Sequence, residues 1–338
     1  MATSNNQQLR KVALYSLARI GAPESADILA MQAAQSGYTF DYTNATASYL
    51  SYLQKTADIK RLQELWRTTN KPGQVHTHTA AFTLLATLQP DKNKLRFPTE
   101  LTHANAQYRA AAMKVAANYK TDEYVELYTF IYKKANTDVK AGLLSLLAAT
   151  GNKAAIPVIT AAIKDKAVQL PAIEAAGRTG DGTVVPALLD AMKSNDTIVI
   201  DAAKQALMTI KSEQLPSQVA AALPAATPAA QVALINVLGA RRAGAQVPAI
   251  WPLLKSNDAK VSKAAYQAVA VSADASQLPQ LFAALAEITA PGQQLTGIQR
   301  GIANALATTP QNEAVTRVAA EMKKRRPTGA VTTCPSYR

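Results

Sequence analysis

Five prolines recur at an almost constant spacing in the second half of the sequence. They lie 29, 30, 32 and 31 residues apart, at Pro157, Pro186, Pro216, Pro248 and Pro279. Each comes near the start of an apolar segment, where a first helical turn tolerates proline because the N–H group that it lacks has no partner there. A second amphipathic segment precedes each one, as VKAGLLSLLAATG precedes IPVITAAIKD. The spacing therefore predicts pairs of helices that repeat about every 30 residues.

The phrase Lys-Ser-Asn-Asp marks the junction between successive pairs. It occurs at residues 193–196 and again at 255–258. Ser, Asn and Asp side chains accept hydrogen bonds from the first N–H groups of a helix, and a Lys suits the end of the preceding helix. Glycines such as Gly151 and Gly180 close the turn inside a pair. One pair cannot bury its apolar face alone, so we expect the pairs to stack into an all-α solenoid.

Composition agrees with this prediction. Hydrophobic residues make up 48% of the 338 residues, aromatic residues only 6%, and alanine dominates the apolar set. Alanine has the highest intrinsic preference for helix, and it lets neighbouring helices approach closely. No apolar run reaches the roughly 20 residues that a membrane-spanning helix needs.

Several segments resemble the HEAT-repeat family. In that family a turn with Asp precedes a Val-Arg pair and an Ala-rich helix. The positions that match are Leu9-Arg10 before KVALYSLARIG, Tyr108-Arg109 before AAAMKVAANY, and the turn residues Asp138, Asp196 and Asp258. In later units Ile200 and Ser262 stand where the family has Arg. The resemblance implies a right-handed α-α superhelix of about ten helical hairpins, with the second helix of each hairpin lining the concave face.

The expected organisation is one solenoid over residues 1–324. Residues 7–135 form irregular, Tyr-rich repeats, and residues 136–324 form regular ones. Pro90 and Pro98 predict a loop or broken helix near 89–102, and SGYTFDYT is a shorter insertion before the second pair. Residues 325–338 follow the basic run KKRR and are expected to form a disordered basic tail.

The net charge of +13 admits nucleic acid as a partner. Basic residues are spread along the chain, however, and a dispersed charge predicts nucleic-acid binding only as an alternative. The first 20 residues lack the clean apolar core of a signal peptide, because Arg19 interrupts them. A complete chain of this kind would be cytoplasmic, and a fragment of a secreted protein would belong to the periplasm or cell envelope. The sequence leaves the localisation open.

A stripe of tyrosines is the first candidate binding surface. Nine of the twelve tyrosines lie between residues 38 and 132. Tyr124, Tyr128 and Tyr132 are four apart, so they share one side of a helix, and Lys133 and Lys134 follow directly. Aromatic side chains beside cations are typical of protein interfaces. The alternative is that these rings fill gaps between layers of helices.

Arginines in the turns inside the pairs are the second candidate. Arg178, Arg241 and Arg242 lie in such turns, as Arg19 does nearer the N-terminus. They form either a basic row for binding or, each alone, a favourable charge at the end of a helix.

Groups for catalysis or metal binding are few. The sequence has three histidines and the single Cys334, and no carboxylate lies at ligand spacing from His76 and His78. We therefore expect no metal site, no cofactor and no enzymatic activity.

The sequence thus favours a non-enzymatic, elongated and monomeric HEAT-like scaffold that binds a protein or peptide on its concave face. One alternative is a basic solenoid that binds nucleic acid. The other follows from a resemblance of the N-terminal part to HEAT regions of large bacterial envelope proteins, which carry sugar-active domains elsewhere in the chain. It is a helical module of such a protein, linked to polysaccharide handling.

Overall fold

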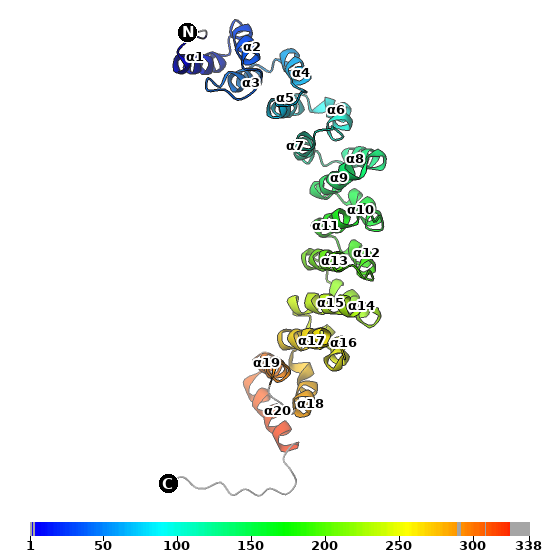
Figure 1. Ribbon diagram of the computed structural model, residues 1–338. Helices are drawn as coiled ribbons and strands as arrows, with labels where there is room; N and C mark the ends of the chain where they lie inside the picture. Colours follow the sequence, from blue (N-terminus) through cyan, green and yellow to red (C-terminus); the bar gives the residue numbers. More distant parts are fainter. Residues whose placement is uncertain (1, 3, 289–291, 308, 325–338) are drawn as a thin grey trace, which may run out of the picture. The chain divides into compact units, whose positions relative to one another are not determined.

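The computed structural model describes residues 2, 4–288, 292–307 and 309–324, and every regular element in that part of the chain is a helix (Figure 1). The all-α prediction is therefore confirmed. The predicted tail, 325–338, lies outside the described residues. The chain divides into two compact units, Met1–Ala161 and Ala162–Arg338, which are described separately below as unit 1 and unit 2.

Unit 1 is built from helical pairs and short 3-10 turns. Its helices are α1 (Gln7–Ile20), α2 (Ser25–Gln35), α3 (Ala45–Thr56), α4 (Ile59–Thr68), α5 (Val75–Leu88), α6 (Asn93–Glu100), α7 (Ala106–Ala116), α8 (Asp122–Lys134) and α9 (Thr137–Thr150), with 3-10 turns η1 (Pro90–Lys92) and η2 (Lys153–Ala155). The helix α10 (Ile156–Ala162) runs across the division between the units.

Unit 2 repeats one arrangement more regularly. Its helices are α11 (Gln169–Thr179), α12 (Val185–Ala191), α13 (Thr197–Thr209), α14 (Leu215–Ala222), α15 (Pro228–Ala240), α16 (Val247–Ile250), α17 (Ala259–Ser272), α18 (Leu278–Glu287), α19 (Gln293–Ala307) and α20 (Gln311–Lys324), with 3-10 turns η3 (Gly182–Val184), η4 (Leu223–Ala225), η5 (Gly244–Gln246), η6 (Trp251–Lys255) and η7 (Ala275–Gln277). The first helices of the pairs, α11, α13, α15 and α17, pack on one another in one layer, and α12, α14 and α16 form a second layer beside it (Figure 1).

The local signals of the sequence mark the helix starts correctly. Asp196 and Asp258, the last residues of the two Lys-Ser-Asn-Asp phrases, are the N-caps of α13 and α17 and accept hydrogen bonds from the first N–H groups. The five regularly spaced prolines each occupy the second position of α10, α12, α14, α16 or α18. At Pro252 the α-helix changes to the 3-10 turn η6, as expected for a proline inside a helical segment.

The segment 89–102 is not a loop. Pro90 opens the 3-10 turn η1, and α6 follows with Pro98 inside it, so the alternative of an interrupted helix holds. Phe97 is fully buried and the Asn93 side chain donates a hydrogen bond to the carbonyl of Ala86 over 2.9 Å. These two contacts fix the short helix although proline breaks its hydrogen-bond pattern.

The cores of the two units differ in composition. Six of the buried core side chains of unit 1 are aromatic: Tyr49, Tyr52, Phe82, Phe97, Tyr108 and Tyr128. In unit 2 the buried hydrophobic side chains that the structure describes are Ala, Val, Leu, Ile and one Met. Neighbouring helices there approach so closely that a Cβ atom added to Gly177 would lie 2.9 Å from the Cα atom of Ala206.

Side chains also link successive pairs by bonding to backbone carbonyls at or just after the ends of earlier helices. In five such bonds, the donor side chain comes 32 to 34 residues after the carbonyl. The bonds are Tyr119 to Ala86 (2.7 Å) and Asn152 to Lys120 (2.8 Å) in unit 1, and Thr209 to Gly177 (2.9 Å), Arg241 to Leu207 (2.7 Å) and Asn304 to Ala270 (2.5 Å) in unit 2. The repeat length of the sequence therefore appears directly in its hydrogen bonds.

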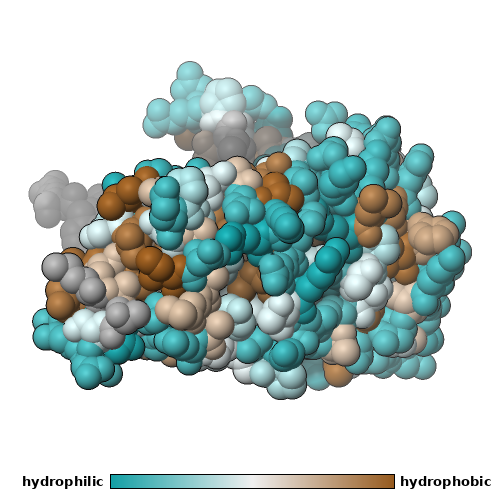
Figure 2. Space-filling model, turned by 90° about the horizontal axis from the view of Figure 1, so that it is seen from above, coloured by the Kyte–Doolittle hydropathy of each residue, from teal (hydrophilic) through white to brown (hydrophobic). Residues whose placement is uncertain are grey.

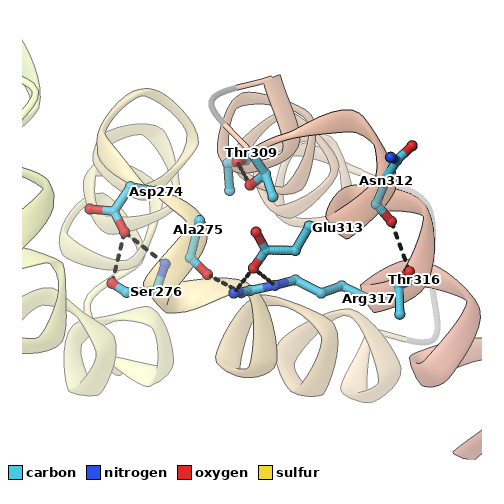
Figure 3. A network of polar contacts seen from close by, with 9 residues as sticks. Asp274, Ala275, Ser276, Thr309, Asn312, Glu313, Thr316 and Arg317 are labelled. Atoms are coloured by element: carbon cyan, nitrogen blue, oxygen red, sulfur yellow. Dashed lines mark hydrogen bonds and ion pairs between the residues drawn. The ribbon is translucent and has the colours of Figure 1, made fainter.

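The two arginines that match the HEAT pattern fold back on the turns before their own helices. Arg10 donates to the carbonyl of Ser4, and Arg109 donates to the carbonyls of His103 and Ala104. Neither forms an ion pair with a turn Asp among the described residues. An arginine also connects the last helix, α20, to the turn η7. Arg317 donates to the carboxylate of Glu313 on its own helix and to the carbonyl of Ala275 over 3.0 Å (Figure 3).

Candidate partner-binding surfaces

Tyr128, the centre of the predicted stripe on α8, lies in the core. Its ring is fully buried, and its hydroxyl donates to the carbonyls of Ala116 and Tyr119 over 2.8 and 3.3 Å. Burial raises the pKa of this hydroxyl. The prediction that Tyr128 faces a partner is therefore wrong. The ring fills the space between α7 and α8, which was the alternative.

Tyr124 is half-buried and joins α8 to η1 and α6. Its hydroxyl donates to the carbonyl of Pro90 over 3.3 Å, and its ring centre lies 5.9 Å from that of Phe97. The ammonium of Lys94 lies 5.7 Å from the ring centre and forms an ion pair with Glu123. Tyr124 thus belongs to an aromatic cluster with Phe97, Tyr119 and Tyr128.

The exposed aromatic side chain of α8 is Phe130, which the stripe did not include. Its exposed fraction is 53%, and the ammonium of Lys134 lies 4.0 Å from its ring centre. Tyr132 is half-buried with Lys140 over its ring, and Lys133 is exposed. The cations that the sequence singled out are therefore at the surface, but Lys134 contacts Phe130 of its own helix.

The turn arginines have separate positions. Arg241 donates to the carbonyls of Leu207, Met208 and Ile210 at the end of α13, and burial lowers its pKa. Arg178 and Arg242 are exposed at the ends of α11 and α15. Of the two roles that the sequence allowed for Arg241, the structure therefore favours the favourable charge at a helix end over a place in a basic row. The guanidinium of Arg241 neutralises the partial negative charge of the carbonyls at the end of α13.

A wide groove lies between α1 and α3 in unit 1. Its volume is about 850 Å³, within the range of about 300–1,000 Å³ usual for binding pockets. We call it the α1–α3 groove. Its lining residues are Lys11, Val12, Tyr15, Ala18 and Arg19 from α1, and Asn44, Ala47, Ser48, Ser51, Gln54 and Lys55 from α3 and its N-cap.

The charged side chains that line the α1–α3 groove are all positive. Val12 and Tyr15 are 62% and 61% exposed, and the lining on α3 is small and polar. Lys11, Arg19 and Lys55 supply three positive charges, and the eleven described lining residues include no Asp or Glu. The guanidinium of Arg19 forms no ion pair or hydrogen bond with any residue that the structure describes.

Aromatic side chains continue from the groove into the insertion SGYTFDYT. Gly37 and Tyr38 both have a positive φ, and they turn the chain so that Phe40 is 91% exposed. Tyr42 is also exposed, and the ammonium of Lys11 lies 5.3 Å from its ring centre. The insertion is visible in the sequence, but neither Phe40 nor Tyr42 is among the binding residues that the sequence predicts.

Unit 2 contains a second groove, between α17 and α19. Its volume is about 870 Å³, and its lining includes Tyr266, Val271, Lys263 and Arg300. Burial and, to a lesser extent, the carboxylate of Glu287 raise the pKa of Tyr266, and Glu287 also pairs with Lys255. The α17–α19 groove therefore has a volume similar to that of the first groove but a carboxylate nearby.

A buried polar cluster lies between α4, α5, α6 and α7 in unit 1. His78 donates through Nδ1 to the carbonyl of Trp66 over 2.7 Å, and burial lowers its pKa from 6.5 to about 4. The Tyr108 hydroxyl bonds to Glu100, whose pKa burial raises. The adjoining cavity of about 200 Å³ is lined by His78, His103 and Tyr108 among others.

The described residues hold no group of three or more His, Cys, Asp or Glu side chains that is arranged to bind a metal ion. Over the same residues, no helix is both long and apolar enough to cross a membrane.

Comparison with known proteins places the repeats in a family. Residues 126–208, from α8 to α13, match the family model described as HEAT repeats. Over these residues, the chain is similar to HEAT repeats. The resemblance seen in the sequence is confirmed over this segment, which leads into the regular helical pairs of unit 2. No curated protein matches the chain.

Two solved structures align with this chain. One is a crystal structure of an engineered protein, 16% identical, with a TM-score of 0.34 over 97% of this chain and 93% of that one. The other is human deoxyhypusine hydroxylase in complex with glycerol, 16% identical, with a TM-score of 0.31 over 71% of this chain and 98% of that one.

Proposed function

We propose that this chain is a non-enzymatic HEAT-repeat scaffold that binds a protein partner, and that unit 1 carries the main binding surface. The support is the distribution of exposed apolar side chains. Fifteen large apolar side chains are exposed among the described residues, and eight of them lie between residues 9 and 42. These eight, which we call the N-terminal apolar surface, are Leu9, Val12, Tyr15, Ile20, Ile28, Met31, Phe40 and Tyr42.

Such a concentration is unusual for a surface that faces only water. Single exposed apolar residues are common on soluble proteins, whereas clustered ones mark interaction sites. The face seen in Figure 2 carries apolar patches among hydrophilic residues. The N-terminal apolar surface belongs to α1, α2 and the following insertion, so the proposal differs from the concave, second-helix surface that the family resemblance implies.

Nucleic acid is the second candidate, and the net charge of +13 favours it. The contacts of individual cations weigh against it. Arg96, Arg109 and Arg241 donate to backbone carbonyls, and so does Lys55. A cation held in this way neutralises the end of a helix and is less available to a phosphate.

The non-enzymatic part of the proposal is supported by the hydrogen bonds of the polar cluster around His78. Its groups are already engaged: Tyr108 with Glu100, His78 with the carbonyl of Trp66, and His103 with Asn70. A general base needs a proton donor of the substrate within reach. Here the nearest donors belong to the protein itself.

The proposal is tested by capture from an extract of the source cells. The parent chain is compared with the double variant Val12→Asp/Tyr15→Ala, with and without nuclease. We expect a protein that the parent retains and the variant loses, unaffected by nuclease and only moderately weakened between about 50 and 200 mM salt. Retention that disappears with nuclease or falls about a thousandfold over that range would instead identify nucleic acid as the partner.

A further inference from the structure

The α1–α3 groove is shaped for a helix. Its two walls come from helices α1 and α3, which pack against each other. Its lining residues on α3 and the preceding N-cap recur at helical spacing, at Asn44, Ala47, Ser48, Ser51, Gln54 and Lys55. Because Ala47, Ser48 and Ser51 in the middle of this row are small, a third helix can approach closely there, as ridges of one helix fit between those of its neighbours.

Apolar anchors lie on the α1 side of the groove. Val12 and Tyr15 are three residues apart on one face of α1, and both are largely exposed. The Tyr15 hydroxyl has no hydrogen-bond partner among the described residues. A ring with a large apolar face and a free polar tip is a frequent hot spot of protein interfaces. The apolar side chains of an amphipathic helix would cover these two residues.

Positive charge surrounds these anchors. The guanidinium of Arg19 has no partner among the described residues, the ammonium of Lys11 lies over the ring of Tyr42, and Lys55 donates to the backbone carbonyl of Arg19. The lining carries three positive charges and no negative one in the described residues. Complementary charge at an interface directs association and excludes partners of the wrong sign.

We infer that the α1–α3 groove binds an acidic amphipathic helix of a partner protein. The apolar face of that helix lies on Val12 and Tyr15, and its carboxylates reach Lys11 and Arg19. This inference rests on the proposed function and names the chemistry of its partner. A phosphate backbone or anionic lipid surface would satisfy the cations but would not use the small lining residues of α3, so a helix accounts for more of the groove.

The direct test uses a designed peptide of about 14 residues, the length of α1. It carries Leu at every third or fourth position and Glu elsewhere, with a fluorescent label, and binding to the full chain is followed by anisotropy. A second peptide has Lys in place of every Glu. The acidic peptide is expected to bind with a dissociation constant below about 1 mM, and the basic peptide is expected not to bind.

Matched variants locate the binding. Arg19→Glu and Tyr15→Ala are each expected to weaken the acidic peptide about tenfold or more, as loss of a hot spot does. Lys60→Glu makes the same charge change on the exposed face of α4, outside the groove, and is expected to change the affinity less than about twofold. Circular dichroism checks that each variant remains helical.

Several results would overturn the inference. Equal binding of the two peptides, equal effects of Arg19→Glu and Lys60→Glu, or no binding at all would each do so. A concentration-dependent dimer that Val12→Asp abolishes would assign the surface to a second copy of the chain. If the acidic peptide fails while capture from the extract still depends on Val12 and Tyr15, the scaffold function stands and only the partner chemistry is wrong.

Discussion

Unit 1 fills the space between its helices with tyrosine and phenylalanine rings, whereas unit 2 brings its helices together over alanine and glycine. In unit 1, hydroxyls such as that of Tyr128 also bond to carbonyls at helix ends. In unit 2, Gly177 allows α11 and α13 to touch almost backbone to backbone. Helical pairs of the same kind can therefore pack either through large aromatic side chains or through small residues that let the backbones come close.

The two solutions differ in what they leave at the surface. Rings of varied size make the pairs of unit 1 irregular, and an insertion such as SGYTFDYT then presents Phe40 to solvent. Unit 2 has the more uniform first helices and fewer exposed large apolar side chains. The comparison suggests a division of roles, in which unit 1 binds and unit 2 supplies regular length. The following predictions test each side of it.

The largest effect is expected from Tyr128→Ala in unit 1. Removing a fully buried aromatic ring should lower the free energy of unfolding by about 3–5 kcal/mol, because it leaves a cavity and takes one hydrogen-bond donor from each of two carbonyls. Urea unfolding followed by circular dichroism measures this. Tyr15→Ala, the same substitution at an exposed site of the same unit, should stay within about 0.5 kcal/mol of the parent. Equal effects would remove the distinction between buried and surface tyrosines.

In unit 2, Gly177→Val is expected to cost about 1–3 kcal/mol by overpacking. An added Cβ would lie 2.9 Å from the Cα atom of Ala206, so the two helices would have to separate. Gln205→Val introduces the same side chain at an exposed position of α13 and should cost only a few tenths of a kcal/mol. Similar losses in both variants would mean that close helix contact is not what holds unit 2.

The pH dependence of unit 1 should follow His78. Its pKa is lowered by burial from 6.5 to about 4, so between these values the unfolded chain binds a proton that the folded chain does not. Stability is therefore lost as the pH falls from about 6.5 towards 4, by roughly 1–2 kcal/mol at pH 5. His78→Gln should show a smaller loss between pH 7 and pH 5 than the parent. Glu100, whose pKa is raised, acts in the opposite direction and is common to both chains.

The smallest effect is expected from the arginines at the end of α15. Arg241→Met should lower the free energy of unfolding by about 1 kcal/mol, because the carbonyls of Leu207 and Ile210 lose a charged donor. Arg242→Met, at the adjacent exposed residue, should change it by less than about 0.5 kcal/mol. If the two substitutions cost the same, the link between α13 and α15 does not depend on this side chain.

Local features of the sequence were sufficient for much of the fold. N-capping by Asp196 and the tolerance of proline in a first turn depend on a few neighbouring residues, so the helix pairs and their period could be read directly. The segment near Pro98 was harder, because burial of Phe97 in the surrounding pairs outweighs the local cost of proline.

Which residues of α1 and α8 are exposed depends on how the helices pack, and the spacing of residues along the sequence does not determine that. Tyr128 shares the buried face of α8 with Val125 and Ile131, and this three-residue pattern was the available sign that it lies in the core. The exposure of Val12 and Tyr15 follows from which sides of α1 other helices cover. Apolar residues on several sides of α1 were the only signal for that surface.

Hydrogen–deuterium exchange of the full chain, with and without the acidic designed peptide, tests most directly whether unit 1 carries the binding surface. Binding slows exchange where it stabilises local structure. The account predicts added protection in α1 and α3, little change in α11 to α17, and no effect of the peptide in the Arg19→Glu variant. Protection that centres on α17 and α19, or that is spread evenly over both units, would contradict it.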